Sequence, residues 1–412
     1  MKPFFKVKTV EEVLGLLERF QPLEAEEVEL AGARGRVLAE DLQADEFVPD
    51  HDRSAMDGFA VRARDTFGAA ETLPALFHLA GEVQMGLEPD FEIGPGQAAR
   101  IWTGGMLPAG ADAVVMIEYS RQVDETSVEL SKPAAPWENV IRRGEDVKPG
   151  QVLLPAGLAL RPQDLGLLAA LGRSIVRVTR RPRAALISTG DEVIPITENP
   201  GPGRVRDVNT YSLGAMLEGF GAEVIRLGLI PDDPARLRAG VERGLALADL
   251  VIVSGGSSMG VRDFAVEVFS SFPGSEILVH GVAVSPGKPL IMAGLGNQSL
   301  WGLPGHAVSA MITADVFVRP LLDRLSGKTR LGKPWGRLVQ AALARNVPSV
   351  HGRQDYIRVR LEQEGGGLKA HPILGKSGLV STMVKADGLV CIGLNEEGRL
   401  AGSLAEVRLF DD

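Results

Sequence analysis

The sequence predicts a multidomain protein of mixed α/β and β class. From residue 183 onward, short apolar segments alternate with amphipathic ones, a pattern typical of parallel strands joined by helices in a doubly wound α/β domain. Between residues 45 and 149, apolar runs are separated by glycine and proline, which favours a β-rich domain. After residue 333 helical periodicity is weak, and the apolar runs predict a second, smaller β domain.

The composition is that of a globular protein whose main partner is not a nucleic acid. Its 412 residues leave room for about two to four domains, and a formal net charge of −9 argues against nucleic-acid binding. Cys391 is the only cysteine, which excludes an intrachain disulfide or a thiolate metal cluster. The segment Met1–Lys6 lacks the apolar region of a signal peptide, and no apolar run is long enough to span a bilayer. We therefore expect a soluble cytoplasmic protein.

Two helices are expected outside the α/β region. Thr9 and Glu12 have the spacing of a capping box at the start of an amphipathic helix that extends to Phe20. Arg161–Leu171 predicts a second helix, with Pro162 suited to its first turn.

The α/β region contains several expected strands and helices. Gly221 ends one helix, and Asp233–Pro234 begins the next. Because ligands bind at the carboxyl ends of parallel strands, the loops at Thr189, Ser254 and Pro304 are expected at one sheet edge. The expected strands are Ala184–Ile187, Glu223–Leu227 and Leu250–Val253, with others near Val282–Val284 and Leu300–Leu303; the other helices lie near Phe264–Phe269 and after Ala307.

The last part of the chain predicts a small β domain that follows a linker. The linker is the polar and basic segment Ser326–Pro334. The expected strands are Arg337–Leu343, Tyr356–Leu361 and Val407–Phe410.

Five loops place an acidic, hydroxyl or ammonium side chain beside glycine and close to an apolar run. Glycine lets backbone N–H groups approach an oxyanion, and nearby carboxylates can hold a divalent cation against the same phosphate. Five such loops in one chain indicate a large anionic substrate held along a cleft. The loops are Ser54–Gly58, Thr103–Gly105, Ser188–Glu192, Ser254–Gly260 and Pro286–Pro289.

Six acidic residues lie in or near glycine-containing turns. Any one of them has an ordinary explanation, because Asp in a turn bonds its own backbone. Convergence on one cleft favours a function: two carboxylates about 4 Å apart repel by about 4 kcal/mol at an effective dielectric constant of about 20, so they need a cation. Mg²⁺ suits oxygen ligands together with a phosphate. The six are Asp57, Asp146, Asp191, Glu192, Asp207 and Asp263.

Two further features are candidate anion sites. Lys288 is the only lysine between Lys148 and Lys328, and it lies on a loop stiffened by prolines. A compact ammonium presented in this way suits an oxyanion, although an accidental surface lysine is the plain alternative. Gly305 precedes an expected helix start, where unpaired N–H groups could bind an anion or simply remain without a ligand.

Common nucleotide signatures do not fit. The segments Gly94–Gly96 and Gly201–Gly203 do not join a strand to a helix, and Gly287 and Lys288 lack the spacing of a P-loop. An NAD enzyme or a P-loop NTPase is therefore disfavoured. The six histidines show no metal-ligand spacing, and we expect His306 to pack rather than to coordinate a metal. No Ser/His/Asp or Cys/His nucleophile arrangement is evident.

In this order, the motifs closely resemble the molybdopterin molybdenumtransferase family, which includes the E domain of gephyrin. The resemblance covers nearly the whole chain, and Ser54–Gly58, Thr189–Glu192 and Pro286–Pro289 are its most specific motifs. The other matching stretches are Arg100–Gly105 with Leu107–Pro108, Arg143–Asp146, Asp207–Asn209, Ser254–Gly256 with Asp263, and Leu303–Gly305.

The resemblance implies a homodimer with four domains in each chain. A discontinuous N-terminal domain would combine residues 1–44 and 150–178, with the β-rich domain of residues 45–149 inserted between them. Residues 179–327 would form the molybdopterin-binding α/β domain, and residues 331–412 a small β-barrel. In such proteins the active site lies between the α/β domain of one subunit and the inserted domain of its partner.

The implied reaction inserts molybdenum from molybdate into adenylylated molybdopterin, with AMP released with the help of Mg²⁺. Such a substrate implies an upstream molybdopterin-adenylylating enzyme. The metal ligands would be Asp57, Glu192, Asp207 and Asp263, and Thr103 and Asp146 would complete the catalytic set. The implied substrate-binding residues are Thr189, Gly190, Asp191, Ser254, Gly255, Gly256, Ser257, Lys288, Pro289, Pro304, Gly305, Ser309, Arg353 and Ser377, of which Lys288, Pro289, Ser309, Arg353 and Ser377 would form the molybdate pocket.

The chain departs from the family pattern at four positions. Ser285 stands where the family often has a lysine, Gly281 stands where some members have another, and His306–Ala307 replaces the usual Asn-Pro. Fewer cations should weaken the attraction for molybdate, which is a dianion. Either other residues compensate, or the protein is a divergent paralogue with reduced insertion activity.

Two other functions are compatible with parts of the sequence. A binding or scaffold module could keep the fold, but it would not need Asp57, Glu192, Asp207 and Asp263 together. An adenylylating or pyrophosphatase relative could share the α/β domain alone, but Asp57 and Thr103 lie outside that domain.

Overall fold

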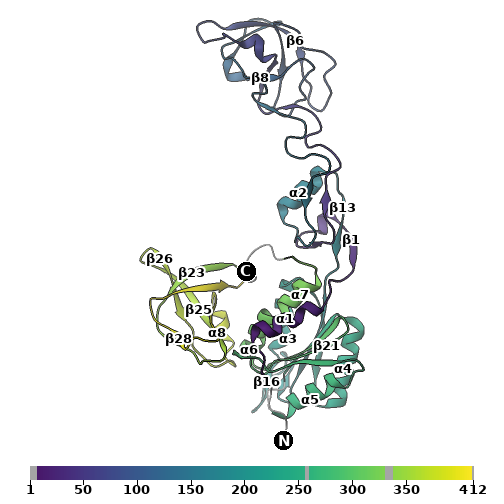
Figure 1. The fold of residues 1–412 in the computed structure, drawn as a ribbon, viewed down its shortest axis with the longest axis vertical. Coiled ribbons are helices and arrows are strands. Elements are labelled where there is room, and N and C mark those ends of the chain that lie inside the picture. The colour runs from purple at the N-terminus through teal and green to yellow at the C-terminus, as the bar shows by residue number, and fades with distance from the viewer. Residues whose placement is uncertain (1–6, 256–258, 330–336, 411–412) are drawn as a thin grey trace. The chain divides into compact units, whose positions relative to one another are not determined.

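The computed structural model describes residues 7–255, 259–329 and 337–410, with the side chains of its helix α5 described from residue 264. The chain divides into two compact units (Figure 1). The first unit comprises Met1–Glu40, Ala156–Arg161 and Ile175–Asp412, and the second comprises Asp41–Pro155 and Pro162–Ser174.

The second unit is β-rich, as predicted for the region between residues 45 and 149. Its main sheet has six strands in the order β8-β5-β7-β6-β10-β9. Both faces of this sheet are buried: Phe59 and Val61 belong to one apolar core, and Ala60 and Val114 belong to another. The strands are β5 (Gly58–Val61), β6 (Ala75–Glu82), β7 (Gln97–Ile101), β8 (Ala113–Met116), β9 (Ser120–Gln122) and β10 (Ser127–Leu130).

Short strand pairs and one helix complete this unit. The predicted helix near Arg161–Leu171 is confirmed as α2 (Pro162–Ala170), with proline at its first position. Its neighbour Leu171 packs with Ala44 and Val147 in a small core. The strand pairs are β3 (Leu42–Gln43) with β12 (Val152–Leu154), and β4 (Arg53–Ser54) with β11 (Val140–Ile141).

In the first unit, a small antiparallel sheet joins segments that are distant in sequence. Its order is β1 (Ala25–Glu29), β13 (Ile175–Thr179) and β2 (Val37–Leu38). This pairing makes the N-terminal part discontinuous. The predicted N-terminal helix is α1 (Val10–Leu16) with a 3₁₀ turn at Leu17–Arg19, and the capping box between Thr9 and Glu12 is formed in both directions.

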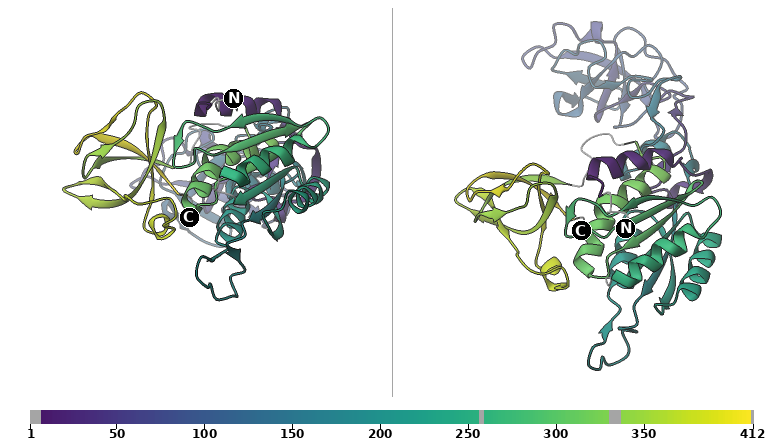
Figure 2. Two further views of the ribbon diagram at one scale, coloured as in Figure 1. Left: turned by 90° about the horizontal axis from the view of Figure 1, so that it is seen from below. Right: turned by 60° about the horizontal axis from the view of Figure 1, so that its bottom comes forward.

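The α/β part of the first unit has one six-stranded sheet in the order β17-β14-β18-β22-β21-β19. Successive residues of a strand enter different cores: Leu186 and Ile252 lie in one, and Ile187 and Val253 lie in the other. Figure 2 shows helices on both faces of this sheet. The strands are β14 (Arg183–Thr189), β17 (Glu223–Ile230), β18 (Leu250–Gly255), β19 (Glu276–His280), β21 (Ile291–Leu295) and β22 (Gln298–Leu303).

Five α-helices belong to this α/β part. Helices α3 and α6 pack against each other, and α4 packs against α5. Asp233 caps α4 by accepting a hydrogen bond from the N–H of Arg236, as its position before Pro234 predicts. The helices are α3 (Asn209–Gly219), α4 (Pro234–Leu247), α5 (Met259–Ser270), α6 (Ala307–Thr313) and α7 (Arg319–Leu325), with a π-helical turn at Ala314–Val318.

The prediction of a wholly parallel sheet is wrong at one side. β21 pairs with β22 in antiparallel register, and β19 pairs with β21 in the same way. Only Gly296 and Asn297 separate β21 from β22, which suffices for a hairpin but not for a parallel crossover. The strand expected near Val282–Val284 is β20 (Val284–Ser285), which pairs with a strand of the C-terminal domain instead.

The C-terminal part is a closed five-stranded β-barrel, which confirms the predicted small β domain. The pairing runs β25-β26-β23-β29-β27, and β27 returns to β25. Closure leaves alternate residues, such as Val359, Val390 and Val407, fully inside. The elements are β23 (Leu338–Leu343), β24 (Val347–Pro348), β25 (Gln354–Glu364), β26 (Gly367–Pro372), α8 (Ser381–Val384), β27 (Gly388–Ile392), β28 (Gly398–Arg399) and β29 (Leu404–Leu409).

Candidate active site

Three loops of the α/β sheet meet at one edge, as predicted. The parallel register places Thr189 beside Gly255, and Ser254 beside Leu303. The strands β14, β18 and β22 therefore end side by side, and the loops that follow them converge. Such an edge is the usual ligand site of an open α/β sheet.

A cavity of about 400 Å³ opens at this edge, and we call it the strand-edge cavity. It brings together Thr189, Glu192, Asp207, Ser254, Gly255 and Gly305 from the predicted site. Its remaining lining residues are Ser188, Val193, Val205, Arg206, Val208, Asn209, His306, Ala307, Gly378 and Val380; Val193 and Val205 lie on the short strands β15 (Val193–Ile194) and β16 (Val205–Arg206).

The two acids of this cavity differ in their surroundings. Asp207 is buried, and its Oδ1 accepts hydrogen bonds from Ser188 Oγ at 3.0 Å and from the N–H of Thr210 at 3.1 Å. These bonds fix the carboxylate at the start of α3 and leave its second oxygen outside both contacts. Glu192 is exposed on the loop after β14. One acid is therefore rigid and the other accessible.

Asp232 joins this edge, although the sequence analysis did not select it. Thr189 Oγ1 donates to Asp232 Oδ1 at 2.7 Å, and the N–H of Asp232 donates to Asp191 Oδ1 at 3.2 Å. The loop after β17 is thus fastened to the loop after β14. The signal for Asp232 was available, since it follows a predicted strand at the same sheet edge.

Asn209 is a second residue to which the sequence analysis gave no role. Its Nδ2 donates to Ser254 Oγ at 2.8 Å and to the carbonyl of Gly305 at 2.9 Å, so it joins two of the three loops. The residue is only 8% exposed, and its side-chain Oδ1 has no hydrogen-bond partner among the described residues. A buried acceptor in a cavity wall is costly unless a ligand donates to it.

A second cavity, of about 700 Å³, lies beside the first, and we call it the cation-lined cavity. It collects Lys288, Pro289, Ser309, Arg353 and Ser377, the five residues of the expected molybdate pocket. The other lining residues are Val7, Val282, Ala283, Val284, Ser285, Pro286, Gly287, Pro304, Gly305, His306, His351 and Gly352.

The loop that carries Lys288 is packed tightly against α6. Gly287 has a φ of +123°, and a Cβ at this position would lie 2.4 Å from Thr313 Cγ2. Glycine is therefore required here for both its conformation and its size. The Val282 N–H donates to the carbonyl of Lys288 at 2.9 Å, which closes the loop and presents the exposed ammonium.

In the second unit, Asp57 and Thr103 form one hydrogen-bonded pair. Asp57 Oδ1 accepts from the backbone N–H and from Oγ1 of Thr103, each at 2.7 Å. The hydrogen bond from the backbone N–H, and to a smaller extent the one from Oγ1, lower the pKa of the Asp57 carboxyl. The loops are tied together, since the Ser54 N–H donates to the Gly105 carbonyl at 2.9 Å.

Asp146 lies exposed on another loop of the same unit. Its backbone N–H donates to the carbonyl of Val48 at 3.2 Å, and the neighbouring Arg143 N–H donates to Asp52 Oδ1 at 2.7 Å.

In the α/β part of the first unit, Gly190 has a φ of +143° beside the Glu192 side chain. Gly256, Ser257 and the side chain of Asp263 lie outside the described residues.

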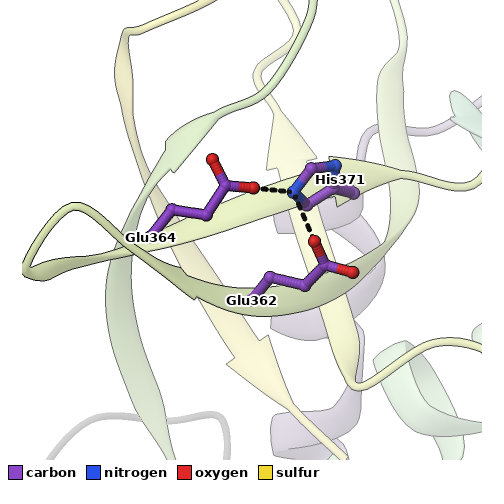
Figure 3. Close-up of side chains that lie close together, drawn as sticks. All are labelled: Glu362, Glu364 and His371. Atoms are coloured by element: carbon purple, nitrogen blue, oxygen red, sulfur yellow. Dashed lines mark hydrogen bonds and ion pairs between the residues drawn. The ribbon is translucent and has the colours of Figure 1, made fainter.

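One further cluster has metal-ligand chemistry but contains no predicted site residue. His371 Nε2 lies 3.2 Å from Glu362 Oε2 and 3.2 Å from Glu364 Oε1 on the β25–β26 hairpin (Figure 3). Arg360 pairs with the first carboxylate, and Lys369 pairs with the second. The cations already balance the carboxylates, so the cluster is an ion-pair network on the barrel surface.

Among the described residues, no helix combines the length and the apolar character that crossing a lipid bilayer requires.

Three family models match the chain in consecutive order. The MoeA N-terminal region (domain I and II) matches residues 8–172, a probable molybdopterin binding domain matches residues 185–324, and the MoeA C-terminal region (domain IV) matches residues 340–410. The likeness is therefore not confined to the α/β domain, as it would be for an adenylylating or pyrophosphatase relative.

Relatives extend this likeness over most of the chain. The molybdopterin molybdenumtransferase of Nostoc sp. is 35% identical over 379 residues, covering 90% of this chain and 86% of that protein. The enzyme of the same name from Bacillus subtilis is 32% identical over 392 residues, covering 94% and 90%. The crystal structure of the molybdopterin biosynthesis moeA protein from Pyrococcus horikoshii OT3 is 31% identical with a TM-score of 0.84, covering 98% of this chain and 100% of that one. The chain therefore belongs to the MoeA family of molybdopterin molybdenumtransferases and is an enzyme of the transferase class.

Proposed function

We propose that this enzyme inserts molybdenum from molybdate into adenylylated molybdopterin and releases AMP, with Mg²⁺ as the metal cofactor. The observation that carries the proposal is the wall shared by the two cavities, to which Gly305 and His306 both contribute. A tetraoxo anion in the cation-lined cavity would lie next to a pterin in the strand-edge cavity. Such proximity is what the transfer of a metal between two bound substrates requires.

The strand-edge cavity would hold the adenylylated pterin. Gly190 and Gly255 have backbone conformations that only glycine adopts easily, and the backbone N–H groups of their loops would bind phosphate oxygens. The buried Asn209 Oδ1 would accept a hydrogen bond from a pterin N–H. Thr189, Asp191 and the backbone of Pro304 and Gly305 would shape the rest of the site.

The acids fit a Mg²⁺ ion held against the pyrophosphate. Both described hydrogen bonds to Asp207 use Oδ1, so Oδ2 is available to a metal, and the exposed Glu192 can approach the same ion. When bound, Mg²⁺ would neutralise the charge that develops on the AMP phosphate. Asp263 and, from the partner subunit, an Asp57 carboxylate held by Thr103 would complete the oxygen set, with Asp146 nearby.

The cation-lined cavity would bind molybdate. Lys288 is exposed in the cavity on a rigid loop, and the hydroxyls of Ser309 and Ser377 can donate to oxo groups. Arg353 forms an ion pair with Asp355 at 3.0 Å, which orients its guanidinium at the rim. Pro289 would contribute shape rather than hydrogen bonds, since proline has no N–H.

We further propose a cytoplasmic homodimer that receives its substrate from an upstream molybdopterin-adenylylating enzyme.

Reconstitution of the purified protein with adenylylated molybdopterin, Mg²⁺ and molybdate should release AMP and yield molybdenum-loaded cofactor. Binding of the pterin without AMP release would instead favour the scaffold function.

Removing the ammonium of Lys288 should weaken molybdate binding selectively. We expect Lys288→Ala to raise the molybdate concentration that gives half-maximal AMP release by about tenfold or more, because one favourable charge near a dianion is lost. Pterin binding should change little. Lys328→Ala is the matched control, since Lys328 is exposed and lies outside both cavities. An unchanged molybdate requirement in Lys288→Ala would remove Lys288 from the pocket.

A further inference from the structure

The cation-lined cavity has less fixed positive charge than its name implies. No Asp or Glu occurs among its described lining residues, and Lys288 and Arg353 are its permanent cations. Arg353, however, is paired with the buried Asp355. The charge of the guanidinium is therefore largely balanced, so that among the described lining residues Lys288 alone would face a dianion with a full charge.

Ser285 and Gly281, the two positions where the family pattern suggested a lysine, differ in their effect on this cavity. Ser285 lines the cavity, so a lysine there would add a cation directly. Gly281 has a φ of +95°, a conformation that disfavours any residue with a Cβ, and it does not line the cavity. Ser285 is therefore the position at which the absence of a lysine lowers the positive charge of the cavity. At position 281 the backbone conformation itself favours glycine.

Two histidines line the same cavity, His306 and His351, and both are exposed to it. Imidazole is the side chain that gains a charge within the physiological pH range. A protonated imidazole can therefore replace an absent lysine as a donor to an oxyanion. Neither histidine was assigned a binding role by the sequence pattern.

His306 is oriented by contacts with the loop after β26. Its Nδ1 lies 2.8 Å from Ser377 Oγ, and the N–H of Val308 donates to the Ser377 carbonyl at 3.2 Å. A Cβ on Gly378 would lie 3.8 Å from His306 Cδ2, so the ring packs against this glycine. The hydrogen bond leaves Nε2 as the nitrogen that can meet a ligand.

Protonation of His306 would also change what Ser377 can do. In the neutral ring, one nitrogen donates and the other accepts, so Ser377 Oγ can be either partner. In the protonated ring both nitrogens donate, and Ser377 Oγ must accept from Nδ1. The hydroxyl hydrogen of Ser377 is then free for an oxo group, so one proton adds a charge and redirects a second donor.

The charged groups around His306 come from two sides. From the cation-lined cavity it is faced by Lys288, Arg353 and His351. The strand-edge cavity, which His306 also lines, contributes Glu192 and Asp207, together with Arg206. His306 therefore lies between a wall that contains acids and a wall that contains cations.

We propose that His306 and His351 are additional oxyanion-binding residues, which on protonation supply the positive charge that Ser285 does not. The proposal rests on the proposed function, because it takes the cation-lined cavity as the molybdate site. Oxyanion affinity should consequently increase as the pH falls through the range in which imidazole titrates.

The test measures oxyanion binding to the full-length protein by titration calorimetry at about pH 6 and about pH 8.5. The probes are molybdate and sulfate, and sulfate keeps its charge over this range, so a slope with sulfate reports protein groups only. Wild type should bind each anion about tenfold or more tightly at the lower pH. His306→Asn, with the family's usual residue, should lose part of this gain, and His306→Asn/His351→Gln should lose nearly all of it.

The matched control is His78→Gln, an exposed histidine outside both cavities, which should keep the wild-type slope. An undiminished slope in the double variant, or a slope with molybdate but none with sulfate, would overturn the inference. AMP release by wild type at saturating molybdate is followed separately. Its absence would reject the proposed function, whereas its presence with an unchanged slope in the double variant would reject the histidines alone.

Discussion

Alanine in place of Asp57 is expected to reduce AMP release by at least about a hundredfold, and Glu192→Ala should have an effect of similar size. Substitutions that merely support a metal ligand commonly cost about ten- to a hundredfold, so loss of a ligand should cost at least as much. Thr103 holds the Asp57 carboxylate through two hydrogen bonds of 2.7 Å, so no neighbouring residue can readily replace it. Both residues are exposed, so their loss should leave the fold intact. Wild-type cofactor assembly in both variants would reject the assignment.

Mixing the two inactive variants tests whether the site is shared between subunits. In a dimer of one Asp57→Ala chain and one Glu192→Ala chain, a shared site would place both defects in one cleft and leave the other cleft intact. We therefore expect mixed dimers to regain AMP release up to about half of the wild-type rate for each dimer. Sites confined to single chains would regain nothing, because each would carry one defect. Each variant exchanged with itself is the control.

The hydroxyl of Thr103 should influence the acid side of the pH–rate profile. The hydrogen bonds from the backbone N–H and the hydroxyl of Thr103 lower the pKa of Asp57. As the pH falls, the carboxylate therefore stays charged until the pH drops through this lowered pKa. Thr103→Val keeps the backbone bond but removes the side-chain bond, so the pKa should rise and activity should be lost at a higher pH. Thr103→Ser retains the hydroxyl and should keep the wild-type profile. Coincident profiles for all three proteins would show that Asp57 does not control the acid limb.

Gly255→Ala is expected to have the largest structural effect of any single substitution considered. An ideal Cβ at Gly255 would lie 1.9 Å from the carbonyl oxygen of Thr189, and its φ of +144° disfavours other residues. The clashing atom belongs to the paired strand, so relief requires β14 and β18 to separate. We expect the free energy of unfolding to fall by about 3 kcal/mol or more, with loss of pterin binding.

Gly219→Ala is the matched control for this prediction. Gly219 is the last residue of α3 in the same compact unit, and a Cβ there would meet nothing within 4 Å. Alanine also favours a helix more than glycine does, so stability should be unchanged or slightly increased. Chemical denaturation measures the free energy of unfolding of both variants. Equal values would show that the close approach of β14 and β18 does not exclude a Cβ at position 255.

Local signals identified many elements because their causes are local. The capping box of Thr9 and Glu12, the cap at Asp233 and the strand that ends at Thr189 all depend on residues close in sequence. The resemblance then supplied the set around Lys288, whose members come from four separate segments and do meet in one cavity. Asp232 follows a predicted strand, but its hydrogen bond with Thr189 could not be predicted, because the two residues are 43 positions apart and only the sheet joins them.

The antiparallel direction of β21 and β19 in the α/β sheet could not be predicted in the same way. The segment that forms β21 has the same apolar character whether its neighbour runs parallel or antiparallel. The short turn at Gly296 decides the matter, and its significance depends on knowing where β21 begins. β20 is similar, because two residues carry no periodicity and only the pairing with β25 assigns them to the barrel sheet.

By itself, the sequence determined which loops carry acids, hydroxyls and the solitary lysine, because glycine and capping chemistry act over a few residues. Only the tertiary structure decided that His306 lies in the wall of two cavities and that Asn209 keeps a buried acceptor without a partner. Those facts depend on strand order and on the docking of the barrel loop against α6. Long-range packing of this kind leaves no periodic trace in the chain.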